Sequence, residues 1–122
     1  MRPVVLITAI VVAAFAAAPA RGDFPAAVAA YDGGDYATAF EEAMAVAAQG
    51  DEDAQYMVGF LYSRGEGVAL DRVRAYLWFS LAADQGDRFA MDALAGLARR
   101  MTAARIAEAE ALARDWRPEP ND

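Results

Sequence analysis

The sequence matches itself when it is displaced by 36 residues, and this internal repeat constrains the fold more than any other feature. Asp, Gln and Gly keep the same register as the more common Ala, which a chance match in an Ala-rich chain does not explain. The matched pairs are Asp35 and Asp71, Ala39 and Ala75, Phe40 and Tyr76, Ala47 and Ala83, Gln49 and Gln85, Gly50 and Gly86, Asp51 and Asp87, and Ala54 and Ala90.

The repeated residues are those expected at helix ends and at close helix contacts. Asp35 and Asp71 stand just before apolar-periodic stretches, where a carboxylate caps the free backbone N–H groups of a helix. Gly50 and Gly86 follow these stretches, where the backbone turns left-handed. One period therefore contains two helices and two connections, which predicts an array of helical hairpins.

Six helices are expected, and they define an all-α fold. This fold is a short solenoid of α/α helical hairpins, with about two and a half to three hairpins. A longer loop with two glycines covers residues 64–70, and Thr102 is expected to cap the last helix. The predicted helices are Phe24–Tyr31, Tyr36–Gln49, Glu52–Ser63, Arg72–Asp84, Arg88–Arg100 and Ala103–Trp116.

The predicted helix Arg72–Asp84 is apolar around most of its circumference. Its large side chains are Tyr76, Leu77, Trp78, Phe79 and Leu81. A helix of this kind must be covered on more than one side, as it is in a stack of hairpins.

The composition excludes most catalytic and metal-binding chemistry. All 11 basic residues are Arg, and neither His nor Cys occurs. Thiol nucleophiles, Ser–His triads, disulfides, zinc sites and Schiff bases on Lys are therefore excluded. The net charge of −7 disfavours nucleic acid and anionic lipid as partners, because both carry negative phosphates.

Residues 1–20 have the pattern of a secretory signal peptide. A positive charge at Arg2 precedes an uncharged apolar run, and small residues allow cleavage after Ala20 or after Gly22. The alternative, an uncleaved membrane anchor, is less favoured because this run is shorter than the ~20 residues that span a bilayer.

Cleavage would leave a helical-repeat domain at residues 23–116 and a polar tail at residues 117–122. The exclusive use of Arg and the high Ala content suggest a GC-rich bacterial genome. We therefore expect a periplasmic or secreted bacterial protein with no stable membrane anchor.

The central stretch resembles a known repeat family. Residues 54–86 read AQYMVGFLYSRGEGVALDRVRAYLWFSLAADQG and are similar to the Sel-1-like repeat, a relative of the tetratricopeptide repeat. Val58 stands where the family has Leu, and Arg74 stands where it has Lys. The other positions of the family pattern are Ala54, Gly59, Tyr62, Gly65, Gly67, Val68, Asp71, Ala75, Trp78, Ala82, Ala83 and Gly86.

The stretches on either side depart further from this pattern. Residues 24–50 match the second half of a repeat but lack the long Gly-x-Gly-Val loop, and residues 87–116 shorten the loop before Thr102. Such units are suited to cap a short array. The resemblance implies an adaptor that holds other proteins in complexes.

Several family positions are expected to be structural. Trp78 and Tyr62 should lie in the core. Gly59 should face an Ala-rich surface and allow close helix contact. Gly65 and Gly67 should adopt positive φ. A phosphate-binding loop at these two glycines is the weaker alternative, because no strand precedes them.

Tyr56, Phe60 and Arg64 are the candidate partner-binding residues. On a helical wheel the two aromatic residues lie opposite Ala54, Val58 and Tyr62, and they are not family positions. They either form an exposed anchor for a partner, with Arg64 beside them, or pack on the preceding hairpin.

Charged clusters near helix ends have simpler explanations than ligand sites. The acidic run at residues 51–53 complements a helix N-terminus, so no metal site is expected there. Four arginines give the last hairpin a basic side, which is either a solvated face or a docking site for an acidic partner. They are Arg99, Arg100, Arg105 and Arg114.

The functional hypothesis is therefore a protein–protein interaction adaptor or scaffold in the bacterial envelope, with an unidentified protein or peptide as its partner. The alternative is a protein that binds a small ligand or a peptidoglycan fragment in the groove between hairpins. An enzyme is least favoured, because no catalytic residue, metal or cofactor site is evident in the sequence.

Overall fold

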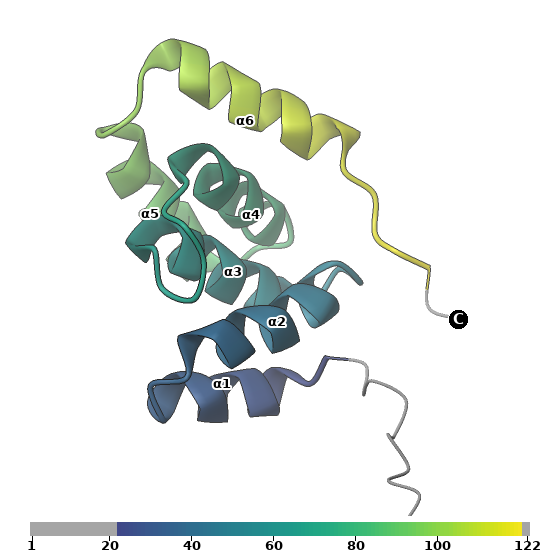
Figure 1. The fold of residues 1–122 in the computed structure, drawn as a ribbon. Coiled ribbons are helices and arrows are strands. Elements are labelled where there is room, and N and C mark those ends of the chain that lie inside the picture. The colour runs from purple at the N-terminus through teal and green to yellow at the C-terminus, as the bar shows by residue number, and fades with distance from the viewer. Residues whose placement is uncertain (1–21, 121–122) are drawn as a thin grey trace, which may run out of the picture.

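A computed structural model describes residues 22–120 of the chain, and every regular element in this range is a helix (Figure 1). The prediction of an all-α fold is confirmed, and each predicted helix end lies within two residues of the observed one. The helices are α1 (Phe24–Asp32), α2 (Tyr36–Ala47), α3 (Glu52–Arg64), α4 (Arg72–Asp84), α5 (Arg88–Ala98) and α6 (Ala103–Asp115).

The predicted signal peptide, residues 1–20, lies outside the described residues. The division into a leader, a repeat domain and a tail therefore stays a prediction. Within residues 22–120, no helix has both the length and the apolar character that crossing a membrane requires.

The helices begin at the capping residues that the repeat indicates. The Asp35 carboxylate accepts a hydrogen bond from the backbone N–H of Thr38, and Asp71 caps α4 through the backbone N–H of Arg74. Hydrogen bonding to the side chain and backbone of Thr38 lowers the pKa of the Asp35 carboxyl. The remaining caps are Asp51 for α3, Asp87 for α5 and Thr102 for α6.

The loop between α3 and α4 packs against the start of α2. Gly65 and Gly67 adopt φ values of 65° and 72°, which confirms the prediction of positive φ. A Cβ atom added to Gly67 would lie 2.1 Å from the carbonyl oxygen of Tyr36. Gly67 is therefore required where two backbone segments meet, which gives this glycine a structural role.

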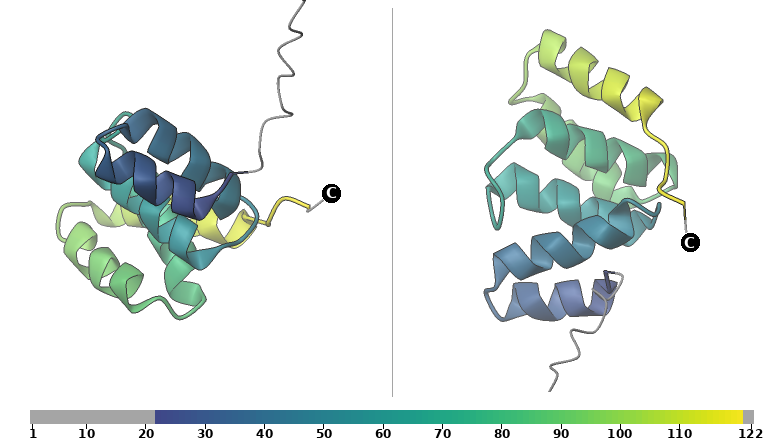
Figure 2. Two further views of the ribbon diagram at one scale, coloured as in Figure 1. Left: turned by 90° about the horizontal axis from the view of Figure 1, so that it is seen from below. Right: turned by 45° about the vertical axis from the view of Figure 1, so that its right-hand side comes forward.

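The helices stack in chain order, with a change at the C-terminal end (Figure 2). α1 pairs with α2, α2 packs on α3, α3 pairs with α4, and α4 packs on α5. α6 then packs on α4, because Ala113 of α6 and Trp116, which follows the helix, pack against the core. The last hairpin of the predicted solenoid is therefore splayed.

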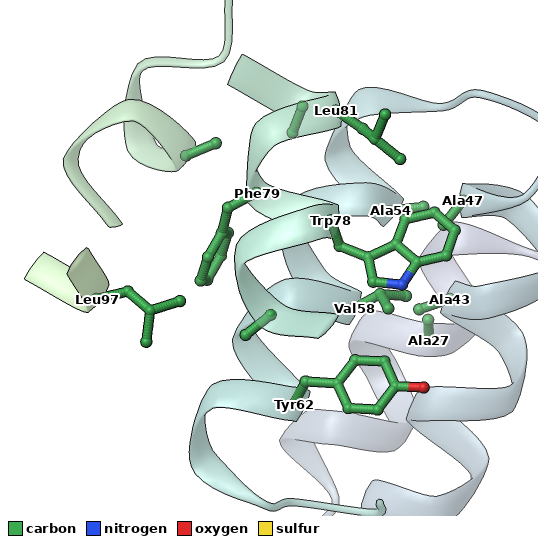
Figure 3. Close-up of a cluster of buried hydrophobic side chains, with 13 residues drawn as sticks. Ala27, Ala43, Ala47, Ala54, Val58, Tyr62, Trp78, Phe79, Leu81 and Leu97 are labelled. Atoms are coloured by element: carbon green, nitrogen blue, oxygen red, sulfur yellow. The ribbon is translucent and has the colours of Figure 1, made fainter. Parts of the chain in front are cut away.

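α4 is covered on three sides, as its all-round apolar surface predicts. It packs against α3, α5 and α6, and it buries Trp78, Phe79 and Leu81. These side chains join Val58 and Tyr62 of α3 in one cluster (Figure 3). Tyr62 and Trp78 are only 6% and 7% exposed, which confirms their predicted place in the core.

Repeated alanines let these helices approach one another closely. A methyl side chain keeps the distance between two helix axes short, so a larger residue at such a position would force the helices apart. The fully buried alanines among the repeated positions are Ala39, Ala47, Ala54, Ala75 and Ala90.

A buried amide joins the first hairpin to the second. Gln55 of α3 is 0% exposed and donates to the carbonyl of Ala47. The Gln85 side chain donates to the Gln55 side-chain oxygen and to the carbonyl of Gly50, at 2.8 Å in both cases. One repeated glutamine thus satisfies polar groups of the preceding repeat.

Residues after α6 return across the molecule to the connection between α2 and α3 (Figure 2). The Trp116 ring meets Trp78 edge to face at 6.1 Å. The backbone N–H of Glu119 donates to the carbonyl of Ala48 at 2.7 Å. The start of the predicted polar tail is therefore held against the repeat domain.

Two glycines inside helices have opposite surroundings. A Cβ atom at Gly59 would lie 2.7 Å from the Phe79 ring, whereas a Cβ atom at Gly96 would meet nothing within 4 Å. The predicted close contact of Gly59 is confirmed, but its neighbour is an aromatic ring and not an Ala-rich surface. The reason is that α4 places a large side chain at this crossing.

We expect Gly59→Ala to lower the free energy of unfolding by about 1–3 kcal/mol, because the added methyl overpacks the buried Phe79 ring. Gly96→Ala is the matched control and should raise it by about 0.5–1 kcal/mol, because Ala loses less backbone entropy in a helix. Urea unfolding followed by circular dichroism measures both changes. Equal effects of the two substitutions would contradict this packing.

Gln85→Ala should destabilise the fold by about 1–3 kcal/mol, because it leaves the buried oxygen of Gln55 and the Gly50 carbonyl without their donor. Gln49→Ala provides the control, since Gln49 is the repeat-related residue and its side chain makes no hydrogen bond within residues 22–120. Thermal unfolding of both variants tests the difference. A loss as large for Gln49→Ala would contradict the assigned role of Gln85.

Candidate interaction surface

The odd-numbered helices α1, α3 and α5 share one side of the stack, and aromatic side chains run across it. The Phe60 ring lies 5.9 Å from Tyr31 of α1, and the Tyr56 ring lies 6.2 Å from Phe89 of α5. Tyr56 and Phe60 are themselves 6.4 Å apart on α3. We call this surface the aromatic face, and it consists of Phe24, Tyr31, Tyr56, Phe60 and Phe89.

Tyr56 and Phe60 form a ridge between two open grooves. The first groove, of about 330 Å³, lies between α1 and α3 and is lined by Phe24, Tyr31 and Met57 in addition to the ridge. The second groove, of about 420 Å³, lies between α3 and α5 and has Phe79 and Leu97 among its lining residues. Both grooves offer apolar surface to a partner.

The structure brings the three predicted partner-binding residues together. The Arg64 guanidinium lies 5.1 Å from the centre of the Phe60 ring, a cation–π arrangement, and it also forms an ion pair with Glu66. Tyr56 and Phe60 are half-buried. Phe60 packs on Tyr31 of the preceding hairpin, as one alternative predicts. Both rings also line the grooves, where a partner can reach them, as the other alternative predicts.

Burial tunes the ionisable groups of this surface. Partial burial raises the pKa of the Tyr56 hydroxyl, and the nearby negative charge of Asp87 raises it further. Burial and the neighbouring Glu66 raise the pKa of Tyr31. Glu66 accepts a hydrogen bond from Arg64, which raises the pKa of that guanidinium, and its second carboxylate oxygen is buried without a partner within the described range.

Two of the four arginines expected to form a basic side, Arg100 and Arg105, line one groove of about 440 Å³ beside the start of α4, together with Arg72. Arg100 also lines the second groove, and Arg105 pairs with Glu108. Arg114 lies in a separate groove between α4 and α6. The expected basic side is therefore found in part.

Sequence reasoning missed three contributors to the surface, namely Phe89, Arg72 and Gly96. Phe89 is 74% exposed on α5, and Arg72 and Gly96 line the second groove. A large aromatic residue two positions after the capping Asp87, off the repeat register, was the available signal for Phe89. Nothing in the spacing indicated that the N-terminus of α4 and the end of α5 would meet.

The comparisons with known proteins agree with this arrangement. The family model of the Sel1 repeat matches residues 52–87, which contain α3, the loop and α4. A comparison with curated proteins found no match. The hairpin of α3 and α4 therefore matches a Sel1 repeat, and Sel1 repeats generally mediate protein–protein interactions.

The raised pKa of Tyr56 predicts a loss of stability in alkaline solution. The unfolded tyrosine ionises at its ordinary value of 10.0 and the folded one at a higher pH, so stability is complete below pH 10.0 and falls as the pH rises toward the folded pKa. Tyr56→Phe should make this fall shallower in urea unfolding at several pH values. The absence of Lys and Cys leaves tyrosine as the main titrating side chain there. An unchanged pH dependence would contradict the assignment.

Proposed function

We propose that this chain is an exported adaptor that binds a segment of another protein on the aromatic face. The single observation that carries the proposal is the continuous row of rings across α1, α3 and α5, flanked by two open apolar grooves. Aromatic side chains that stand beside open grooves are typical anchors of protein interfaces.

Phe89 is the side chain whose position supports this function most directly. It is 74% exposed, although burial of a Phe side chain stabilises a protein by about 1.5–3 kcal/mol. Its ring lies next to Tyr56 and leaves most of its surface in solvent. A partner that covers this ring would recover that stabilisation as binding free energy, less the cost of association.

The location in the bacterial envelope is part of the proposal and rests on the sequence of residues 1–20. Their apolar run and small-residue exit are typical of a cleaved signal peptide. An adaptor made only of packed helices, without disulfides, is compatible with an oxidising compartment because it contains no thiol to oxidise.

The alternative, a binder of peptidoglycan fragments or other small polar ligands, has less support. Sugars need convergent hydrogen-bonding groups, and the first groove contains Asp53 and the Tyr hydroxyls among otherwise apolar residues. The second groove adds Ser63 and arginines, which suit a charged peptide better than an uncharged sugar.

Co-purification from the cell envelope tests the adaptor function. We expect a tagged chain to retain a specific protein, and Phe89→Ala to weaken the complex about tenfold or more while leaving the fold intact, because the ring is mostly exposed. Tyr56→Ala with Phe60→Ala should abolish binding, provided that circular dichroism shows a folded variant.

Leu112→Ala is the matched control, since Leu112 is 44% exposed on α6, away from the aromatic face. A partner lost in the Phe89 variant and kept in the Leu112 variant locates the interface, and calorimetry with the purified partner then measures its affinity. If no partner is retained by any form of the chain, the adaptor function is wrong.

A further inference from the structure

Gly96 is a glycine that the packing of the protein does not require. A Cβ atom at this position meets nothing within 4 Å, and glycine in a helix is less stable than alanine. Gly96 nevertheless lines the second groove, between Ala93 and Arg100 on the same side of α5. The absence of a side chain at Gly96 leaves space in the groove that a bound molecule would fill.

Three arginines stand at one end of this groove. α3 and α5 run in the same direction, because each is antiparallel to α4 (Figure 2). Arg64 at the end of α3 and Arg100 after α5 therefore lie at the same end, where α4 begins with Arg72. Within residues 22–120, Arg72 and Arg100 form no ion pair, and Arg64 pairs only with Glu66.

In the part of the chain that the structure describes, the lining of this groove contains three arginines and no carboxylate. The groove is therefore a local positive site in a chain whose net charge is −7. Such a site selects the charge of a bound chain.

We propose that the second groove binds a peptide segment of a partner protein that combines apolar side chains with carboxylates, with the partner backbone passing close to Gly96. This inference rests on the proposed function and names the chemistry of its partner. The apolar residues contact Phe60, Phe79 and Leu97, and the carboxylates meet the guanidinium groups of Arg72 and Arg100.

Each part of this segment has a physical reason. Arg binds carboxylates through parallel hydrogen bonds, and Arg72 and Arg100 have their donors free of protein carboxylates in the described range. A methyl group at Gly96 would project from the lining of the groove and hold a peptide backbone away. Extended anionic polymers such as nucleic acid are disfavoured by the net charge of −7 of the whole chain.

A displayed library of random peptides about ten residues long, each spanning roughly 30 Å when extended, tests the chemistry. The protein used to select peptides is the full chain in the form that the cell produces. We expect selected peptides to carry aliphatic or aromatic residues together with Asp or Glu. Arg100→Glu should remove the acidic preference. Arg99→Glu is the matched control, because it makes the same change of charge one residue away. Arg99 does not line the groove, so this variant should keep the acidic preference.

Fluorescence anisotropy with the most enriched peptide then measures affinity. We expect Arg100→Glu and Arg72→Glu each to weaken binding about tenfold or more, with a strong dependence on salt, and Arg99→Glu to change it less than threefold. Gly96→Ala should weaken binding about tenfold while raising the melting temperature, which separates a binding role from a structural one.

The outcomes distinguish this inference from the proposed function. Apolar peptides without acidic residues, bound at the aromatic face and lost in Phe89→Ala, would overturn this inference and leave the adaptor function standing. A library that yields no binding peptide contradicts both. Self-association in sedimentation experiments, lost in Arg100→Glu, would assign the groove to a second copy of the chain instead. Unchanged binding in Gly96→Ala would remove the assigned role of the glycine.

Discussion

The coverage of α4 on three sides is the constraint on which the rest of the structure depends. This helix carries Trp78, Phe79 and Leu81 around its circumference, so it cannot remain at an edge of the stack. α3 and α5 cover two sides, and α6 covers the third by leaving α5 and bringing Trp116 against Trp78. The return of the chain from Trp116 to Ala48 follows from the same packing, since it links the last helix to the first hairpin.

The candidate site is a consequence of this arrangement. Because α4 takes the inner position, the odd-numbered helices are left with one side open, and Tyr56, Phe60 and Phe89 lie on that side without being needed by the repeat. The same stacking places the ends of α3 and α5 beside the start of α4, which concentrates arginines at one end of a groove. An acidic chain thus presents a local positive site beside apolar rings.

Local residue chemistry predicted most of the fold. Asp35 and Asp71 were recognisable as caps, and Gly65 and Gly67 as positions of positive φ, because each requirement involves only a few neighbouring residues. The surface was predicted in part. Tyr56, Phe60 and Arg64 share one face of one helix, which periodicity reveals, whereas Phe89, Arg72 and Gly96 join them from other helices. The neighbour of Gly59 was predicted wrongly for the same reason, since it depends on how α3 crosses α4.

The sequence by itself determined that the chain folds as helical hairpins in a 36-residue register, that α4 must be buried, and that thiol, imidazole and lysine chemistry are absent. These properties follow from residue type and spacing along one helix or one turn. Only the tertiary structure decided that α6 packs on α4, that Gln85 satisfies the buried Gln55, and that two grooves flank the aromatic ridge. The physical reason is that crossing angles and side-chain volumes between helices set these contacts, and no spacing within a single helix contains that information.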